Sequence, residues 1–151
     1  MWLCVQCETP AAAATRAQAI RAKKAAATQA DCHDLVGIAT AFPTDAGVQY
    51  NVCDVMFHIA VNGEAEGARK LLAAGGHCAA VAALHAFSTN AGVLERACGA
   101  LYYIAVNGGA DAVAAIRAVD GTLIDKLTQA RDVMRAGGWG DYAAEVLALL
   151  G

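Results

Sequence analysis

The sequence has few aromatic residues, few prolines and few charges for a chain of 151 residues. Aromatic side chains make up 6% of it, charged side chains 17%, and there are two prolines. So little proline disfavours a loop-rich or disordered protein. The chain is nevertheless 58% hydrophobic, and much of that fraction is alanine. Because alanine is the best helix former and has little bulk, we predict an all-α protein of thin, closely spaced helices.

The charge of the chain does not indicate a nucleic-acid partner. The net charge is −3, and no acidic tail or broad basic surface is evident. One acid-poor stretch between Glu8 and Asp31 gathers positive charge at Arg16, Arg21, Lys23 and Lys24. Such a stretch is typical of organelle transit peptides, but the repeat described below accounts for it as a helix with a solvated outer face.

No segment reads as a membrane span. The least charged window, near residues 75–94, is interrupted by two histidines and by Ser88, Thr89 and Asn90. The apolar amino terminus, MWLCVQC, lacks the basic flank of a secretory signal. We therefore expect an intracellular, cytoplasmic protein with no membrane partner.

One segment of the chain is written twice. Residues 42–63 and 87–108, offset by 45 residues, are identical at eleven of twenty-two positions. The same offset predicts three helices per unit, with units at about 15–61, 62–106 and 107–151 and residues 1–10 left as a cap or the remnant of an earlier unit. A period of roughly 40–47 residues is typical of helical solenoids, in which stacked units bury a core that one unit cannot bury alone.

The third helix of each unit has a regular apolar face. We predict that its core residues are Val48, Val52, Val55, Met56, Ile59 and Ala60 in the first unit and Val93, Ala97, Ala100, Leu101, Ile104 and Ala105 in the second. Val146, Leu147, Leu149 and Leu150 continue the apolar pattern at the carboxyl end. Asn-Gly sequences after these helices are interpreted as stops.

The third-helix sequences resemble those of armadillo repeats. ACGALYYIA (97–105) is similar to that family's third helix, VCDVMFHIA (52–60) is a looser match, and Gly-Gly at 75–76 precedes a second helix as in the family. The resemblance covers about 15–151, with an armadillo-like repeat domain over 11–151. It implies a right-handed α-solenoid of about three three-helix repeats, whose third helices line a concave groove that binds a peptide or a partner protein.

The outward face of the third helices supplies the candidate site residues. We predict groove contacts at Asp54, His58, Arg96 and Tyr103, flanked by Asn51, Phe57, Tyr102 and Asn107. The resemblance places the tryptophan positions of importin-alpha-type members at Asp54, Gly99 and Ala144, and their asparagine positions at His58, Tyr103 and Ala148. This departure from the family's ladder disfavours a receptor of that kind. We expect a non-enzymatic protein-binding scaffold with no cofactor.

The six cysteines leave a second interpretation open. Cys53 and Cys98 occupy equivalent repeat positions, which is typical of small core residues. Cys4 and Cys7 form a C-x-x-C pair, a spacing used for zinc and for dithiol chemistry. Cys32 and His33 are the nearest further candidate ligands, but adjacent helical residues point in different directions. A zinc- or thiol-dependent protein is therefore the alternative to the scaffold.

The apolar carboxyl-terminal sequence LALLG indicates a third possibility. Terminal repeats usually carry a polar outer face. We expect this end to self-associate or to stack on a larger repeat assembly, of which the chain would be a subunit or a fragment.

Overall fold

The computed structural model describes residues 8–151, and every regular element in that range is helical. The prediction of an all-α protein is therefore confirmed. Within this range, no helix combines the length and the apolar composition that a membrane span requires. The described residues form α1 (Pro10–Arg21), the 3-10 turn η2 (Lys24–Ala26), α2 (Gln29–Ala41), α3 (Ala46–Ala74), α4 (Gly76–Ala86), α5 (Ala91–Arg117), α6 (Leu123–Ala136) and α7 (Tyr142–Leu150).

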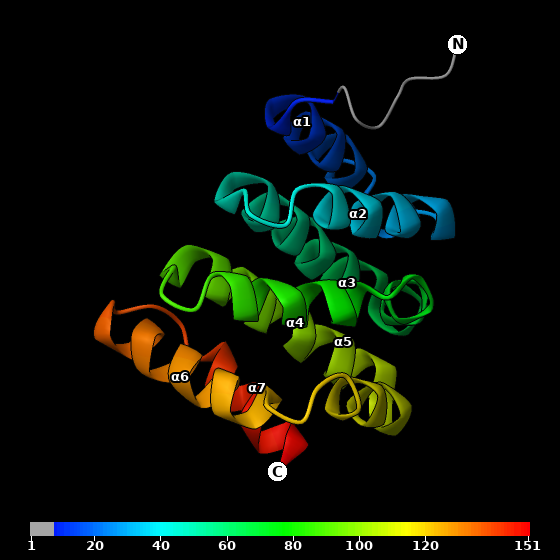
Figure 1. Ribbon diagram of the computed structural model, residues 1–151. Helices are drawn as coiled ribbons and strands as arrows, with labels where there is room; N and C mark the ends of the chain where they lie inside the picture. The colour runs from blue at the N-terminus through cyan, green and yellow to red at the C-terminus, as the bar shows by residue number, and fades with distance from the viewer. Residues whose placement is uncertain (1–7) are drawn as a thin grey trace.

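The helices form two packed rows. One row contains α1, the first part of α3, the first part of α5 and α7, each of which contacts the next. The other row contains α2, α4 and α6, which contact one another in that order and pack on the first row. Figure 1 shows the rows descending together from α1 at one end of the molecule to α6 and α7 at the other.

The helices α3 and α5 each join two helices that the sequence predicted to be separate. The backbone turns at Glu64 (φ 49°) and at Gly109 (φ 72°), which lie 45 residues apart, and the residues on both sides stay helical. The predicted breaks after the Asn-Gly sequences are therefore confirmed, and each break is a kink of one residue that joins two helices without a loop. A positive φ redirects the chain within one residue, so the next helix begins without a loop. Gly67 permits the sharp angle in α3, since a Cβ there would lie 2.3 Å from the carbonyl oxygen of Ile59.

The amino-terminal region differs from the prediction that the acid-poor stretch forms a single helix. The helix α1 ends at Arg21, and α2 begins anew because Thr28 and Asp31 form a capping box. Between them, Lys24 takes a positive φ of 52°. The predicted single helix is therefore two helices with a turn between them.

The helix α1 lies beside the first part of α3 at one end of the first row. It runs parallel to α3, because Gln18 contacts Asn51 and Arg21, one turn later, contacts Asp54. Lys24 turns the chain after α1 much as the two kinks turn it within α3 and α5. The predicted first helix of the first unit thus lies beside α3 as α3 lies beside α5.

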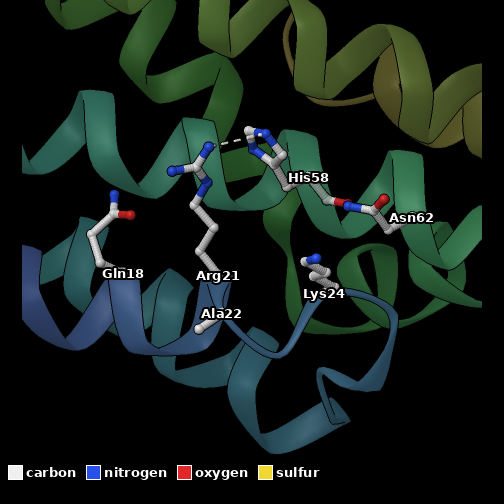
Figure 2. A pocket seen from close by; sticks show the side chains of 6 residues that line it. All are labelled: Gln18, Arg21, Ala22, Lys24, His58 and Asn62. Atoms are coloured by element: carbon white, nitrogen blue, oxygen red, sulfur yellow. Dashed lines mark hydrogen bonds between the residues drawn. The ribbon is translucent and has the colours of Figure 1, made fainter.

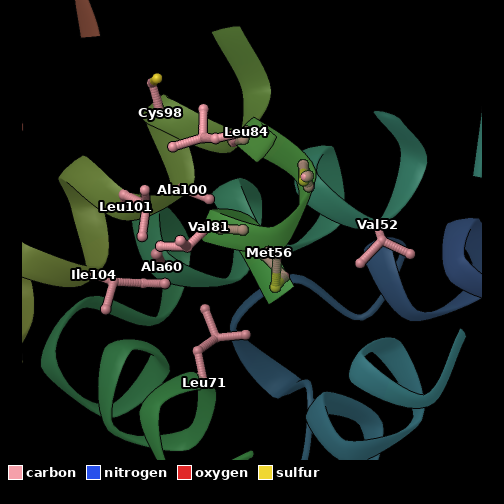
Figure 3. Close-up of a cluster of buried hydrophobic side chains, with 14 of the residues drawn as sticks. Val52, Met56, Ala60, Leu71, Val81, Leu84, Cys98, Ala100, Leu101 and Ile104 are labelled. Carbon is pink, nitrogen blue, oxygen red and sulfur yellow. The ribbon is translucent and has the colours of Figure 1, made fainter. Parts of the chain in front are cut away.

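The predicted core positions of the third helices are confirmed. All twelve residues from Val48 to Ala60 and from Val93 to Ala105 that were assigned to the core are at most 2% exposed. Figure 3 shows several of them packed against Leu71, Val81 and Leu84. Each large apolar side chain buried in this way stabilises the fold by about 1.5–3 kcal/mol.

The carboxyl end is less uniformly buried than its sequence predicted. Val146 and Leu150 lie in the core, Leu147 is half-buried, and Leu149 is 36% exposed. The prediction that Leu149 belongs to the core is therefore wrong. The physical reason is that α7 is the last helix of its row and has no neighbouring helix on one side.

Candidate functional site

A buried carboxylate joins three helices of the first row. Asp54 on α3 is 5% exposed, and its Oδ2 lies 3.3 Å from Nε of Arg21 on α1. Its Oδ1 lies 3.2 Å from Nε of Arg96 on α5. Asp54 was predicted as a groove contact, but it lies beneath the surface and anchors two arginines whose side chains are partly exposed. Its burial leaves the two arginines as the charged groups that reach the surface at this place.

His58 lies next to this carboxylate and is held in one orientation. Its Nδ1 is 2.7 Å from the carbonyl oxygen of Asp54, so Nδ1 carries the proton and donates it. In the neutral ring, Nε2 then accepts from Nη2 of Arg21 at 3.3 Å. His58 therefore positions Arg21 and remains partly exposed, as its predicted place on the outward face requires.

Four rings form an aromatic cluster beside the ion pairs: Phe57, Tyr102, Tyr103 and Tyr142. Five pairs of these rings have centroids between 5.0 and 6.1 Å apart, mostly in edge-to-face geometry. All four are half-buried. Edge-to-face pairs of this kind contribute about 0.5–1.5 kcal/mol beyond their buried area. The pKa of Tyr142 is raised mainly by burial and, to a smaller extent, by a hydrogen bond with Tyr103.

Two further features hold the cluster to the arginine network. The guanidinium carbon of Arg96 lies 5.4 Å from the ring centre of Phe57 and 5.9 Å from that of Tyr50. These distances are typical of cation–π contacts. Gly99 leaves room for the rings, since a Cβ there would lie 2.9 Å from the Phe57 ring and 3.3 Å from that of Tyr142.

The two predicted asparagines make internal hydrogen bonds. Asn51 accepts from Gln18 of α1 and donates to the carbonyl oxygen of Gly47 at 2.7 Å. Asn107 donates to the carbonyl oxygen of Ala60, close to the kink in α3, at 2.8 Å. Both amides therefore tie neighbouring elements together, and their role as contacts stays a prediction.

The structure adds four residues to this surface that the sequence did not assign to it: Arg21, Lys24, Tyr50 and Tyr142. Arg21 and Lys24 belong to the acid-poor run, which was interpreted as a solvated outer face. Tyr142 was missed because α7 begins 51 residues after α5, whereas α5 begins 45 residues after α3. The constant offset placed Ala144 and Ala148 at the site instead.

A hollow opens between α1 and α3 on the same surface. It has a volume of about 350 Å³ and is lined by Gln18, Arg21, Ala22, Lys24, His58 and Asn62. Figure 2 shows Arg21 reaching from α1 to His58 on α3, with Gln18 at one end of the opening and Lys24 and Asn62 at the other. No carboxylate lines it, so the hollow is basic; we refer to it as the basic hollow.

Three of the four cysteines in the described residues, Cys32, Cys53 and Cys98, are buried free thiols, and Cys78 is exposed. Burial raises the pKa of Cys32 to about 11 and that of Cys53 to about 12, and it also raises the pKa of Cys98. Cys32 is fully buried and His33 is exposed, so the two do not face one site. Within residues 8–151 no group of three metal-ligating side chains comes together. Cys4 and Cys7 lie outside the described residues.

The exposed part of α7 bears on the predicted self-association. Leu149 and Ala148 face solvent at this end of the row. Self-association or stacking through it stays a prediction.

Comparison with protein-family models, with curated proteins and with solved structures finds no match to this chain.

Proposed function

We propose that the chain is a small armadillo-like solenoid that binds an extended peptide segment of a partner protein and has no catalytic role of its own. The binding surface is the outward face of α3, α5 and α7, which we call the row face. It is defined by Tyr50, Phe57, His58, Arg96, Tyr102, Tyr103 and Tyr142. The resemblance of residues 97–105 to an armadillo third helix and the 45-residue spacing of the kinks support this assignment.

The observation that carries the proposal is the joining of the aromatic cluster to arginines held by a buried acid. Tyrosine and arginine are enriched among residues that dominate protein–protein binding energies. Here Arg96 lies against Phe57 while its Nε is held by Asp54, which is 5% exposed. A side chain that is already ordered loses less conformational entropy when a partner binds.

The parallel arrangement of the helices favours an extended partner. Side chains from α1, α3 and α5 meet at Asp54, and rings from α3, α5 and α7 meet in the aromatic cluster. A peptide crossing the row would therefore meet cations first and rings next. Its apolar side chains would pack on the half-buried rings, and its backbone would accept hydrogen bonds from the arginines and tyrosines.

Selection from a random peptide display library tests this proposal. The bait is the wild-type protein, and binders are then measured against His58→Ala/Tyr103→Ala. A matched control, His33→Ala/Ile124→Ala, removes an imidazole and an apolar side chain from exposed positions on the other row. Circular dichroism first establishes that all three proteins are equally helical.

We expect enriched peptides to bind the control as they bind the wild type and to lose at least tenfold in affinity for the row-face variant. Equal binding to all three proteins would place the contacts elsewhere and overturn the assignment to the row face.

A further inference from the structure

We propose that the basic hollow is a docking site for a phosphorylated serine or threonine side chain of the bound peptide. This inference rests on the proposed function, because the hollow adjoins the row face at His58. The His58 ring meets the Phe57 ring edge-on, with 5.2 Å between the ring centroids. A peptide lying on the aromatic cluster would reach the hollow by continuing from α3 toward α1.

The charge of the hollow is the first support. Lys23 pairs with Asp31 and Arg16 pairs with Glu8, but no carboxylate in the described part of the chain pairs with Lys24. Arg21 shares the single carboxylate of Asp54 with Arg96. The hollow therefore has an excess of positive charge in a chain whose net charge is −3.

The available donors are the second support. Arg21 uses Nε toward Asp54 and one Nη2 proton toward His58, which leaves the rest of its guanidinium for a ligand. Lys24 contributes an ammonium group that no carboxylate of residues 8–151 pairs with. Both side chains line an opening of about 350 Å³, which is at the lower end of the roughly 300–1,000 Å³ typical of ligand pockets.

The backbone at Lys24 is the third support. Its φ of 52° is a conformation that costs most residues about 1–2 kcal/mol and costs glycine little. Gly109 makes the comparable turn in α5 without that cost. A lysine at this turn is therefore unfavourable for the fold. The positive charge that Lys24 places at the hollow offers a reason why a lysine stands there.

A phosphoryl group fits these features better than a carboxylate does. It carries a charge of about −1.5 to −2 near neutral pH, with three acceptor oxygens, so it can engage Arg21 and Lys24 together. A carboxylate carries one negative charge and would leave one cation without compensation. Guanidinium and ammonium groups are also the usual protein partners of phosphate.

The test uses immobilised degenerate peptide pools of equal composition in which one fixed position is phosphoserine, glutamate or serine. Retention of the full-length protein is measured for the wild type and for Lys24→Gln, Lys24→Gly and Lys126→Gln. Lys126 is the control, because its substitution removes the same charge as Lys24→Gln. It lies on α6, which packs on α4, α5 and α7 and not on the helices of the hollow. Thermal unfolding is measured alongside, and Lys24→Gly is expected to unfold at a temperature no lower than the wild type, since glycine tolerates the positive φ.

We expect at least tenfold stronger retention on the phosphoserine pool than on the serine pool, with an intermediate value for glutamate. Both Lys24 variants should lose about tenfold on the phosphoserine pool, and Lys126→Gln should not. Equal retention on the phosphoserine and serine pools, or an unchanged affinity of the Lys24 variants, would overturn the proposal.

Two further results separate this inference from the proposed function. If the serine pool is retained by the wild type and released by His58→Ala/Tyr103→Ala, the row face binds peptides and only the phosphoryl site is wrong. If inorganic phosphate shifts the amide resonances of residues 21–24 while the phosphoserine pool is not retained, the hollow binds a free anion and the peptide-docking proposal is overturned.

Discussion

The two copies of the duplicated segment, 42–63 and 87–108, are both apolar at the six predicted core positions of their third helices but differ in residue type at the positions that form the site. Ile59 and Ile104 are both buried, as are Cys53 and Cys98. At the site, Asn51, Asp54 and His58 of the first copy correspond to Arg96, Gly99 and Tyr103 of the second. The core positions of both copies serve the same stacking, whereas the outward positions serve different neighbours.

The outward differences are complementary between the copies. The acid of the first copy, Asp54, pairs with the cation of the second, Arg96. The glycine of the second copy, Gly99, accommodates the ring of Phe57 from the first. The duplicated segments therefore diverge in a matched way, and the site belongs to the pair of helices rather than to either copy.

A substitution next to the first kink should have the largest effect on the free energy of unfolding. Gly67 follows the first kink closely, and an alanine Cβ there would lie 2.3 Å from a backbone oxygen. Because a backbone group cannot move aside easily, we expect Gly67→Ala to lower the free energy of unfolding by about 3 kcal/mol. Chemical denaturation measures this change.

Gly63→Ala is the control for this variant. A Cβ at Gly63 meets nothing within 4 Å, so alanine should raise stability by up to about 1 kcal/mol through its helix propensity. Similar effects of the two substitutions would contradict the close approach at Gly67.

The ion pairs around Asp54 should give the next largest effect. We expect Asp54→Ala to lower the free energy of unfolding by about 2 kcal/mol, because the ion pairs of a buried carboxylate that join α1, α3 and α5 are lost. The exposed pair of Glu66 and Arg69 lies within one helix, and Glu66→Ala should change stability little. Equal losses in the two variants, measured by urea denaturation, would show that Asp54 does not crosslink the row.

The two kink residues themselves should respond in opposite directions. Gly109→Ala places a Cβ at a φ of 72° and should cost about 1–2 kcal/mol. Glu64→Gly relieves a φ of 49° and should raise stability by up to about 1 kcal/mol. Thermal unfolding of both variants measures this, and a shift of the same sign in both would contradict equivalent kinks.

The start of α2 should give the smallest effect, visible in acid. Burial raises the pKa of Asp31, but hydrogen bonds from Lys23 and Thr28 outweigh it, so the pKa is lowered overall. A carboxyl whose pKa is lowered by folding stabilises the protein above its unfolded value, about 3.9, and the stabilisation is lost as the pH falls through the folded value. Asp31→Asn should cost up to about 1 kcal/mol at neutral pH.

Urea denaturation between neutral pH and pH 3 checks this prediction. The difference between Asp31→Asn and the wild type should narrow as the pH falls below about 4. A difference that stays constant with pH would mean that the charge of Asp31 contributes nothing to the helix cap.

Much of the helical architecture could be predicted from the sequence, and much of the site could not. The period of apolar residues located the core faces, because helical spacing of Val, Ile and Leu depends only on local geometry. The 45-residue offset located both breaks in the helices. It did not predict that each break is a one-residue kink, because a glutamate such as Glu64 gives no sign of a positive φ in the sequence. Thr28 and Asp31 carried a helix-start signal that was overlooked in the basic run.

The missing site residues depend on contacts between distant segments. Arg21 joins the site only because α1 lies parallel to α3, which no local pattern records. Tyr142 joins it because the connection before α7 is longer than the repeat predicts. The sequence did carry one sign of this contact. Asp54 is an acidic residue among the apolar residues of a helix, and a buried carboxylate needs a cationic partner such as Arg21.

Chemical-shift mapping of the isotope-labelled protein with a peptide selected on it tests whether the row face binds. The predicted result is that amide and side-chain resonances of Tyr50, Phe57, His58, Arg96 and Tyr103 shift together with increasing peptide, while those of α2, α4 and α6 change little. Shifts confined to the second row, or no peptide that perturbs the row face, would contradict a peptide-binding function for this surface.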